Sequence, residues 1–227
     1  MDKITYESLE AYMQSCMSDS AHDAEHVYRV LANAMVIAKD EPEADMDVLI
    51  CACLLHDIGR ADQLKDPSLC HAQVGAEKAY AYLIGHGFAE DFAQHMRSCI
   101  RTHRFRKNAP PESLEAKILF DADKLDVVGA IGIARTLVYK GAVSAPLYNR
   151  RNGMISDGRE DTQQSFFQEY CFKLEKLYDR FYTESGKNLA LQRRGAAVSF
   201  YENLYREVSE LDERGKNQLE SCLERGQ

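Results

Sequence analysis

The residues of this sequence that are best suited to chemistry are histidines and aspartates in separate segments. His56 and Asp57 stand side by side at the end of an apolar run that begins at Cys51. Imidazole nitrogens and carboxylate oxygens both ligate divalent metals, and a buried aspartate without a partner is costly, so this ending suggests a compensating cation. A hydrogen-bonded histidine at a helix end would also explain the doublet by itself.

Other segments carry the same residue types. His22 and His26 precede the doublet, and Asp121 and Asp123 follow it at a distance. His22 and His26 are four residues apart, so they share a face if both lie in the first turn of a helix. Five of the seven histidines fall in these motifs, which random placement would rarely produce: His22, His26, His56, His71 and His103.

The ordered set of a helical histidine, a His-Asp doublet and a distant aspartate resembles the signature of the HD superfamily of metal-dependent phosphohydrolases. The chain looks most like the bacterial HD hydrolases that include a nucleoside triphosphate pyrophosphohydrolase. It shares with them the segments Cys70-His71-Ala, Ile100-Arg-Thr-His103 and Asp121-Ala-Asp-Lys-Leu-Asp126. The similarity runs from about residue 19 to about residue 148, and more loosely through the C-terminal third.

The resemblance implies one divalent ion per chain, with positions left open for water and substrate. The family's pattern places a ligand directly before the basic residue, which selects Asp123 and leaves Asp121 as a supporting or capping group. Asp126 is expected to pair with an arginine. These ligand types suit Mn, Fe, Co, Ni or Zn, and the resemblance leans toward Mn or Mg, with manganese favoured. The expected ligands are His26, His56, Asp57 and Asp123.

The remaining histidines of the motifs are expected to be catalytic. We expect His71 and His103 to contact phosphate or donate a proton, with His22 at the edge of the site. In some HD families two such histidines ligate a second metal. We prefer one ion because no additional carboxylate is evident for a second; Asp66 and Glu77 are the nearest candidates.

Four basic residues are expected to bind substrate. Lys124 directly follows a ligand, so its ammonium could reach a phosphate, a role that the resemblance supports. Arg29 is expected to contact phosphate or to buttress Asp57. Arg104 and Arg106 belong to a basic cluster unusual in an acidic chain, although arginines after a helix are usually only solvated.

The elements that must position these residues read as helices, because apolar residues recur at spacings of three and four and there are only five prolines. We expect an all-α, single-domain helical bundle of the HD type over residues 1–227. A polar loop is expected at 61–69, and a longer loop, a possible lid, at 141–161. The expected helices are 3–17, 23–39, 46–57, 71–83, 90–103, 112–125 and 126–139, with two or three more within 162–184 and 189–223.

Composition narrows the class of protein. A net charge of −8 argues against a broad nucleic-acid surface. No run approaches the 18 or more apolar residues of a membrane span, and no secretory signal is evident, so we expect a cytoplasmic protein. Cys51, Cys53 and Cys99 lie in apolar helical patterns and are expected to be reduced, buried thiols.

We therefore expect a metal-dependent phosphohydrolase that acts through metal-activated water on a nucleotide or a related phosphorylated small molecule. Nucleoside triphosphate pyrophosphohydrolysis is the specific activity that the resemblance implies. A di-iron oxygenase of the HD type is an alternative from another enzyme class. A non-catalytic nucleotide-binding or sensing module is the alternative outside enzymes.

Overall fold

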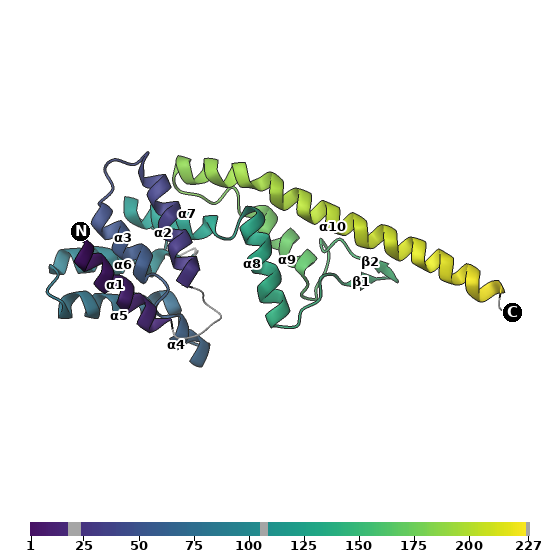
Figure 1. Ribbon diagram of the computed structural model, residues 1–227, viewed down its shortest axis with the longest axis horizontal. Helices are drawn as coiled ribbons and strands as arrows, with labels where there is room; N and C mark the ends of the chain where they lie inside the picture. Colours follow the sequence, from purple (N-terminus) through teal and green to yellow (C-terminus); the bar gives the residue numbers. More distant parts are fainter. Residues whose placement is uncertain (18–23, 105–108, 226–227) are drawn as a thin grey trace. The chain divides into compact units, whose positions relative to one another are not determined.

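The protein is helical over most of the chain in a computed structural model that describes residues 1–17, 24–104 and 109–225 (Figure 1). The predicted all-α fold is confirmed. The helices are α1 (Lys3–Cys16), α2 (Ala24–Ala38), α3 (Met46–Leu55), α4 (Arg60–Lys65), α5 (His71–Gly85), α6 (Glu90–Thr102), α7 (Leu114–Leu125), α8 (Gly129–Ala142), α9 (Phe166–Phe172), a 3-10 turn at Leu174–Lys176, and α10 (Glu184–Arg225).

The chain divides into two compact units. The first unit comprises Met1–Asp126 and Phe181–Asn188, and the second comprises Val127–Arg180 and Leu189–Gln227. The segments singled out in the sequence all belong to the first unit. One domain spanning residues 1–227 stays a prediction.

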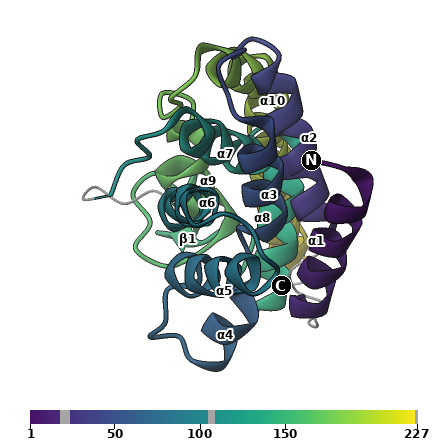
Figure 2. The same ribbon diagram turned by 90° about the vertical axis from the view of Figure 1, so that its left-hand side faces the viewer.

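The core of the first unit is built around α3, which contacts α1, α2, α5, α6 and α7 (Figure 2). Its side chains are apolar on nearly every side, which is what a helix surrounded by other helices requires. Asp45 caps its N-terminus by accepting hydrogen bonds from the backbone N–H groups of Asp47 and Val48. The His-Asp doublet follows the last residue of this central helix and is therefore buried.

The turn after α3 brings α5 against the doublet. A Cβ on Gly59 would lie 2.3 Å from the carbonyl oxygen of His71 and 2.6 Å from the backbone nitrogen of Gly75. Only glycine permits this approach, so it places the first residue of α5 beside the end of α3.

The polar loop predicted at 61–69 is wrong in its first half, because Arg60–Lys65 forms α4. Asp62 lies in the first turn of this helix and pairs with Lys78 of α5 at 2.9 Å. The same ammonium donates to the carbonyl oxygen of Ile58. Tertiary contacts with α5 thus stabilise a helix too short to show a pattern of its own.

Three further details of the first unit concern α1, Asp121 and the cysteines. The buried side chains of α1 are Leu9 and Met13, whereas Ile4 is 79% exposed. The expected capping role of Asp121 agrees with its contacts: its carboxylate accepts from the backbone N–H groups of Tyr182 and Thr183, just before α10. The cysteines expected to be buried thiols are confirmed as free and buried: Cys51, Cys53 and Cys99.

The second unit contains the hairpin of β1 (Arg150–Arg151) and β2 (Met154–Ile155), in which Arg150 pairs with Ile155. It lies inside the loop expected at 141–161, where Asn152 and Gly153 both adopt the positive φ that tight hairpin turns need. The two or three helices expected within 162–184 and 189–223 are found as α9 and α10, although α10 begins at Glu184 rather than near residue 189.

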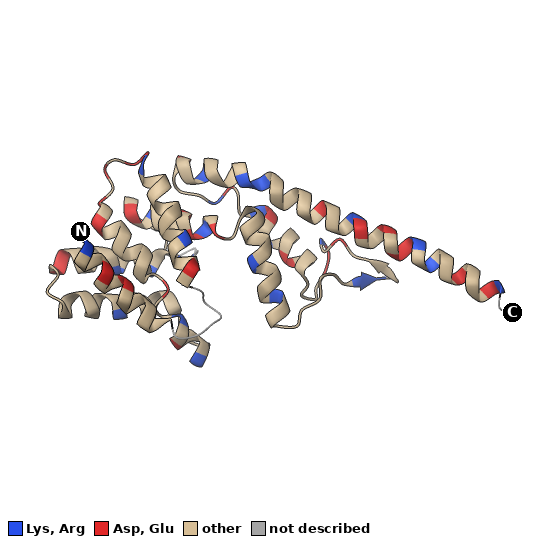
Figure 3. Ribbon diagram, viewed as in Figure 1, with Lys and Arg blue, Asp and Glu red and all other residues tan. Residues whose placement is uncertain are grey.

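Gly129 packs closely against α10, because a Cβ at this position would lie 2.7 Å from the Cβ of Arg193. Charges of both signs follow one another along α10 (Figure 3). No helix among the described residues is long and apolar enough to cross a membrane.

Candidate metal centre

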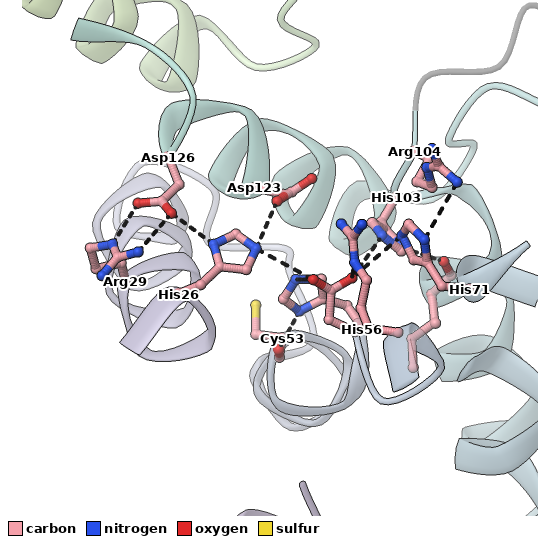
Figure 4. Close-up of polar contacts among 12 residues, drawn as sticks. His26, Arg29, Cys53, His56, His71, His103, Arg104, Asp123 and Asp126 are labelled. Carbon is pink, nitrogen blue, oxygen red and sulfur yellow. Dashed lines mark hydrogen bonds and ion pairs between the residues drawn. The ribbon is translucent and has the colours of Figure 1, made fainter. Parts of the chain in front are cut away.

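Four histidines and two aspartates meet within the first unit (Figure 4). They come from different helices, and several stand where a helix begins or ends. The contributing residues are His26 in α2, His56 and Asp57 directly after α3, His71 at the start of α5, His103 directly after α6, and Asp123 in α7.

The carboxylate of Asp57 lies between two pairs of histidines. Its Oδ2 is 3.5 Å from Nε2 of His26 and 3.7 Å from Nε2 of His56. Its Oδ1 is 3.5 Å from Nε2 of His71 and 3.6 Å from Nε2 of His103. Two groups of candidate ligands result: His26, His56 and Asp123, and Asp57, His71 and His103.

Two of the histidines are oriented by main-chain carbonyl groups. The Nδ1–H of His56 donates to the carbonyl oxygen of Cys53, and the Nδ1–H of His103 donates to that of Ile100, both at 2.7 Å. Each carbonyl belongs to the last turn of the helix that carries the histidine, where helix geometry leaves acceptors unsatisfied. Nδ1 carries the proton, so Nε2 presents its lone pair to Asp57.

The other two are oriented by side chains. His71 donates through Nδ1–H to Oε1 of Gln63 at 2.6 Å, and Gln63 donates in turn to the carbonyl oxygen of Leu69, which fixes the orientation of the amide. His26 donates through Nδ1–H to Oδ2 of Asp126 at 2.7 Å. All four rings therefore direct Nε2 toward Asp57.

This arrangement leaves polar atoms buried without hydrogen-bond partners among the described residues. They are Nε2 of His56, His71 and His103 and both carboxylate oxygens of Asp57, a residue that is 1% exposed. Such atoms are costly unless something binds them. They are acceptors and a carboxylate, so a divalent cation fits the cluster.

The pKa values agree with a site arranged for a cation. Burial lowers the pKa of His56 to about 4 and that of His71 to about 2, which keeps both rings neutral. Burial raises the pKa of Asp57, but its electrostatic interactions with His56 and Arg60 outweigh burial and hold the pKa well below the usual range. Burial lowers the pKa of His26, but hydrogen bonds to Asp123 and Asp126 outweigh it and raise the pKa to about 9.

Arg29 binds a carboxylate near the cluster: its Nε lies 2.7 Å from Oδ1 of Asp126. The expected pairing of Asp126 with an arginine is thereby found. Asp66 and Glu77 do not join the cluster, because Asp66 accepts from Ser68 and Glu77 from Arg97.

The surroundings of two other predicted site residues, Arg104 and Lys124, are described by the structure. Nη1 of Arg104 is 3.4 Å from Nδ1 of His71, beside the second group of ligands. Lys124 is 9% exposed, and its ammonium stands 4.3 Å from the centre of the Phe120 ring. His22 and Arg106 lie outside the described residues.

Two residues near the cluster were missed. Arg60 places Nε 3.0 Å from Oδ1 of Asp57, although the atoms are not aligned for a hydrogen bond. Gln63 orients His71. Gln63 falls in the segment taken for a loop, and Arg60 directly precedes it. The i, i+3 spacing of Asp57 and Arg60 is the one sequence signal that could have indicated Arg60.

A helical unit whose buried histidines and aspartates converge through their coordinating atoms defines a class of protein that holds a divalent metal. Residues 23–128 match the HD domain family and include every residue of the cluster. This chain therefore carries an HD domain.

Relatives agree with this assignment. The uncharacterised Bacillus subtilis protein YpgQ is 29% identical over 212 residues, which cover 91% of this chain and 95% of YpgQ. The crystal structure of YpgQ in complex with ADP is similar with a TM-score of 0.69, at 27% identity, over 89% of this chain and 97% of that one.

Two further structures are of proteins named as HD-superfamily hydrolases. The one from Bacillus thuringiensis has a TM-score of 0.70 at 26% identity, covering 90% of this chain and 97% of its own. A predicted hydrolase from an uncultured Thermotogales bacterium has a TM-score of 0.61 at 29% identity, covering 88% and 91%. The comparisons support a metal-dependent hydrolase in general.

Proposed function

We propose that the protein is a metal-dependent phosphohydrolase acting on a nucleotide or a related phosphorylated small molecule. One observation carries the proposal: a buried carboxylate, Asp57, shared by four histidines that all direct Nε2 toward it, within an HD domain. The crystal structure of YpgQ with ADP supports a nucleotide as the ligand class. Within that class, hydrolysis of a nucleoside triphosphate to release pyrophosphate is the specific activity we propose, in the cytoplasm.

The cation is proposed to be one manganese ion per chain. A bound divalent cation supplies a water ligand of lowered pKa and neutralises charge on phosphate oxygens. The protein's own contribution is to hold the coordinating atoms in place and to keep the ring of His56 neutral. Its proposed ligands are His26, His56, Asp57 and Asp123, of which Asp57 is anionic by virtue of its lowered pKa.

His71 and His103 are proposed to act on the substrate side. Their Nδ1–H groups are engaged by Gln63 and by the carbonyl oxygen of Ile100, so either ring, when neutral, can only accept at Nε2. Each would therefore take a hydrogen bond or a proton from water or a protonated phosphate oxygen. Arg104 beside His71, together with Lys124 and Arg106, completes the proposed substrate-contacting set, and His22 is a further proposed catalytic residue. Arg29 is proposed to act through Asp126, which its guanidinium binds.

A second candidate follows from the second group of ligands, because Oδ1 of Asp57 supplies the carboxylate that the sequence had not identified for a second ion. Two ions per chain would admit the di-iron oxygenase alternative. Metal counting decides: two irons per chain with oxygen uptake would favour oxygenation, and one manganese with phosphate release would exclude it.

The decisive experiment is activity profiling of protein loaded with Mn²⁺ against a panel of nucleoside mono-, di- and triphosphates, with identification of the leaving group. We expect turnover of at least one nucleotide, with pyrophosphate rather than orthophosphate released from a triphosphate. Turnover that persists in Asp57→Ala would identify a contaminant. Tight nucleotide binding without any turnover by metal-loaded protein would overturn the proposal in favour of a sensing module.

A further inference from the structure

Among the four histidines of the cluster, His26 is the one whose Nδ1–H donates to a carboxylate within the described part of the chain. His56 and His103 donate to main-chain carbonyl oxygens and His71 to an amide oxygen, whereas His26 donates to the carboxylate of Asp126. His26 is therefore supported differently from the other three.

Asp126, which binds the ring of His26, is in turn bound by Arg29. Oδ2 of Asp126 lies 2.7 Å from Nδ1 of His26 and 3.1 Å from Nη2 of Arg29, while Oδ1 lies 2.7 Å from Nε of Arg29. Asp126 is 1% exposed, so its charge needs this compensation, and the two-point contact with the guanidinium holds the plane of the carboxylate. The ring of His26 is consequently held at a fixed orientation.

The three residues join two helices that both carry candidate ligands. His26 and Arg29 are three apart on α2 and share one face of it. Asp126 ends α7, and its backbone N–H donates to the carbonyl oxygen of Asp123, whose Oδ1 is 3.3 Å from Nε2 of His26. The same short segment thus carries one ligand and the anchor of the other.

We propose that Asp126 and Arg29 are positioning residues for His26, which set its tautomer, fix its ring and strengthen Nε2 as a metal ligand. A carboxylate that accepts from Nδ1–H increases the basicity of Nε2 more than a neutral carbonyl does. Arg29 keeps Asp126 charged and aligned. The inference rests on the proposed metal site and adds that its affinity depends on a pair of residues that touch neither metal nor substrate.

The test measures the dissociation constant of Mn²⁺ by equilibrium titration with detection of free Mn²⁺ by electron paramagnetic resonance. Asp126→Asn and Arg29→Gln are compared with Glu115→Gln as a matched control. Glu115 is a buried carboxylate of the same helix whose Oε2 lies 3.0 Å from Nε2 of His95, and it does not belong to the cluster. We expect Asp126→Asn to weaken Mn²⁺ binding about 10- to 100-fold and Glu115→Gln to leave it unchanged.

A kinetic readout separates positioning from general destabilisation. Raising the Mn²⁺ concentration should restore kcat in Asp126→Asn without changing the KM for nucleotide. Since Arg29 is part-exposed, Arg29→Gln carries the test if Asp126→Asn fails to fold. The inference would be overturned if Asp126→Asn and Arg29→Gln bound Mn²⁺ as tightly as the wild type, or if Glu115→Gln lost as much Mn²⁺ affinity as they do. Wild type that binds Mn²⁺ but hydrolyses nothing would overturn the proposed function alone.

Discussion

The two oxygens of Asp57 face different histidine pairs, so this single carboxylate belongs to both groups of candidate ligands. We expect Asp57→Ala to lower metal affinity more than about 100-fold, beyond the loss typical of residues that only support a ligand. Activity should fall with it. Metal content after dialysis and nucleotide turnover, measured on one preparation, test this. Full metal content in Asp57→Ala would contradict the ligand assignment.

The raised pKa of His26 predicts that metal binding depends on pH. Without metal the ring stays protonated up to a pKa of about 9, and a ligand must lose that proton before it binds. The affinity should therefore rise with pH and level off above about pH 9, with close to one proton released per ion at neutral pH. Calorimetric titration in two buffers of different ionisation enthalpy measures the release, and binding with none would contradict the pKa.

The raised pKa of His26 also makes the stability of the metal-free protein depend on pH, but in the opposite direction: stability falls as pH rises, whereas metal affinity increases. Because the folded pKa of His26 lies above its unfolded value, this contribution is complete below about pH 6.5 and is lost as pH rises through about 9. The lowered pKa values of His56 and His71 act the other way, since their contribution is present above about pH 6.5 and is lost as pH falls.

Lys124 separates substrate handling from metal binding, since an ammonium cannot ligate a cation. We expect Lys124→Met, which keeps the aliphatic contact with Phe120, to retain metal while kcat/KM falls by about 1.5 to 3 kcal/mol in transition-state free energy. Lys117→Met, two turns earlier on α7, is the control. Unchanged kinetics in Lys124→Met would end the phosphate role, and loss of metal would mean that the lysine helps to hold the site together.

At the scale of elements, the contact between the α3–α4 turn and α5 is set by glycine. A Cβ on Gly59 would overlap the backbone of His71 and Gly75, so Gly59→Ala must displace α5. We expect a cost of about 1 to 3 kcal/mol or more, together with weaker metal binding because His71 moves. Gly85→Ala, where a Cβ meets no atom within 4 Å, is the control. Thermal unfolding measures both, and equal stability of the two variants would contradict the proposed role of Gly59.

Sequence periodicity predicted the large helices of the first unit, because each buries one apolar face. For α1 the predicted range 3–17 compares with the observed Lys3–Cys16, and for α7 112–125 compares with Leu114–Leu125. It missed α4, whose Asp62 pairs with the distant Lys78, and the β1–β2 hairpin, whose Arg150 pairs with the distant Asp212. A two-residue strand leaves no period to detect.

The sequence was enough to predict which residues form the candidate site, but it did not predict how their side chains are arranged. Residue types and a family resemblance were enough to select the residues that the fold brings together around Asp57. The sharing of Asp57 by two histidine pairs follows from ring orientations, and these depend on acceptors such as Gln63 and the carbonyl oxygen of Ile100. No spacing in the sequence reveals which acceptor a ring nitrogen will meet. The roles assigned to individual residues stay predictions.

At the scale of the whole molecule, a bound ion would link the ends of α2, α3 and α7. Ligand binding to the folded state alone stabilises it by about 2.7 kcal/mol at one hundred times the dissociation constant. For a chain of this length that corresponds to a rise of about 5 to 10 °C in Tm. We expect a chelator to lower the Tm of metal-loaded protein by this amount and to leave Asp57→Ala unchanged. An equal shift in both would point to metal bound elsewhere.

The anchors of the four histidines also differ in how they can be lost in evolution. A carbonyl group of the main chain persists through any substitution at Cys53 or Ile100 that keeps the helix, so His56 and His103 inherit their orientation from the backbone. His26 and His71 rely on the side chains of Asp126 and Gln63, which one nucleotide change can remove. Substitutions are therefore expected to change the orientation of His26 and His71 more readily than that of His56 and His103, and to do so at positions 63 and 126.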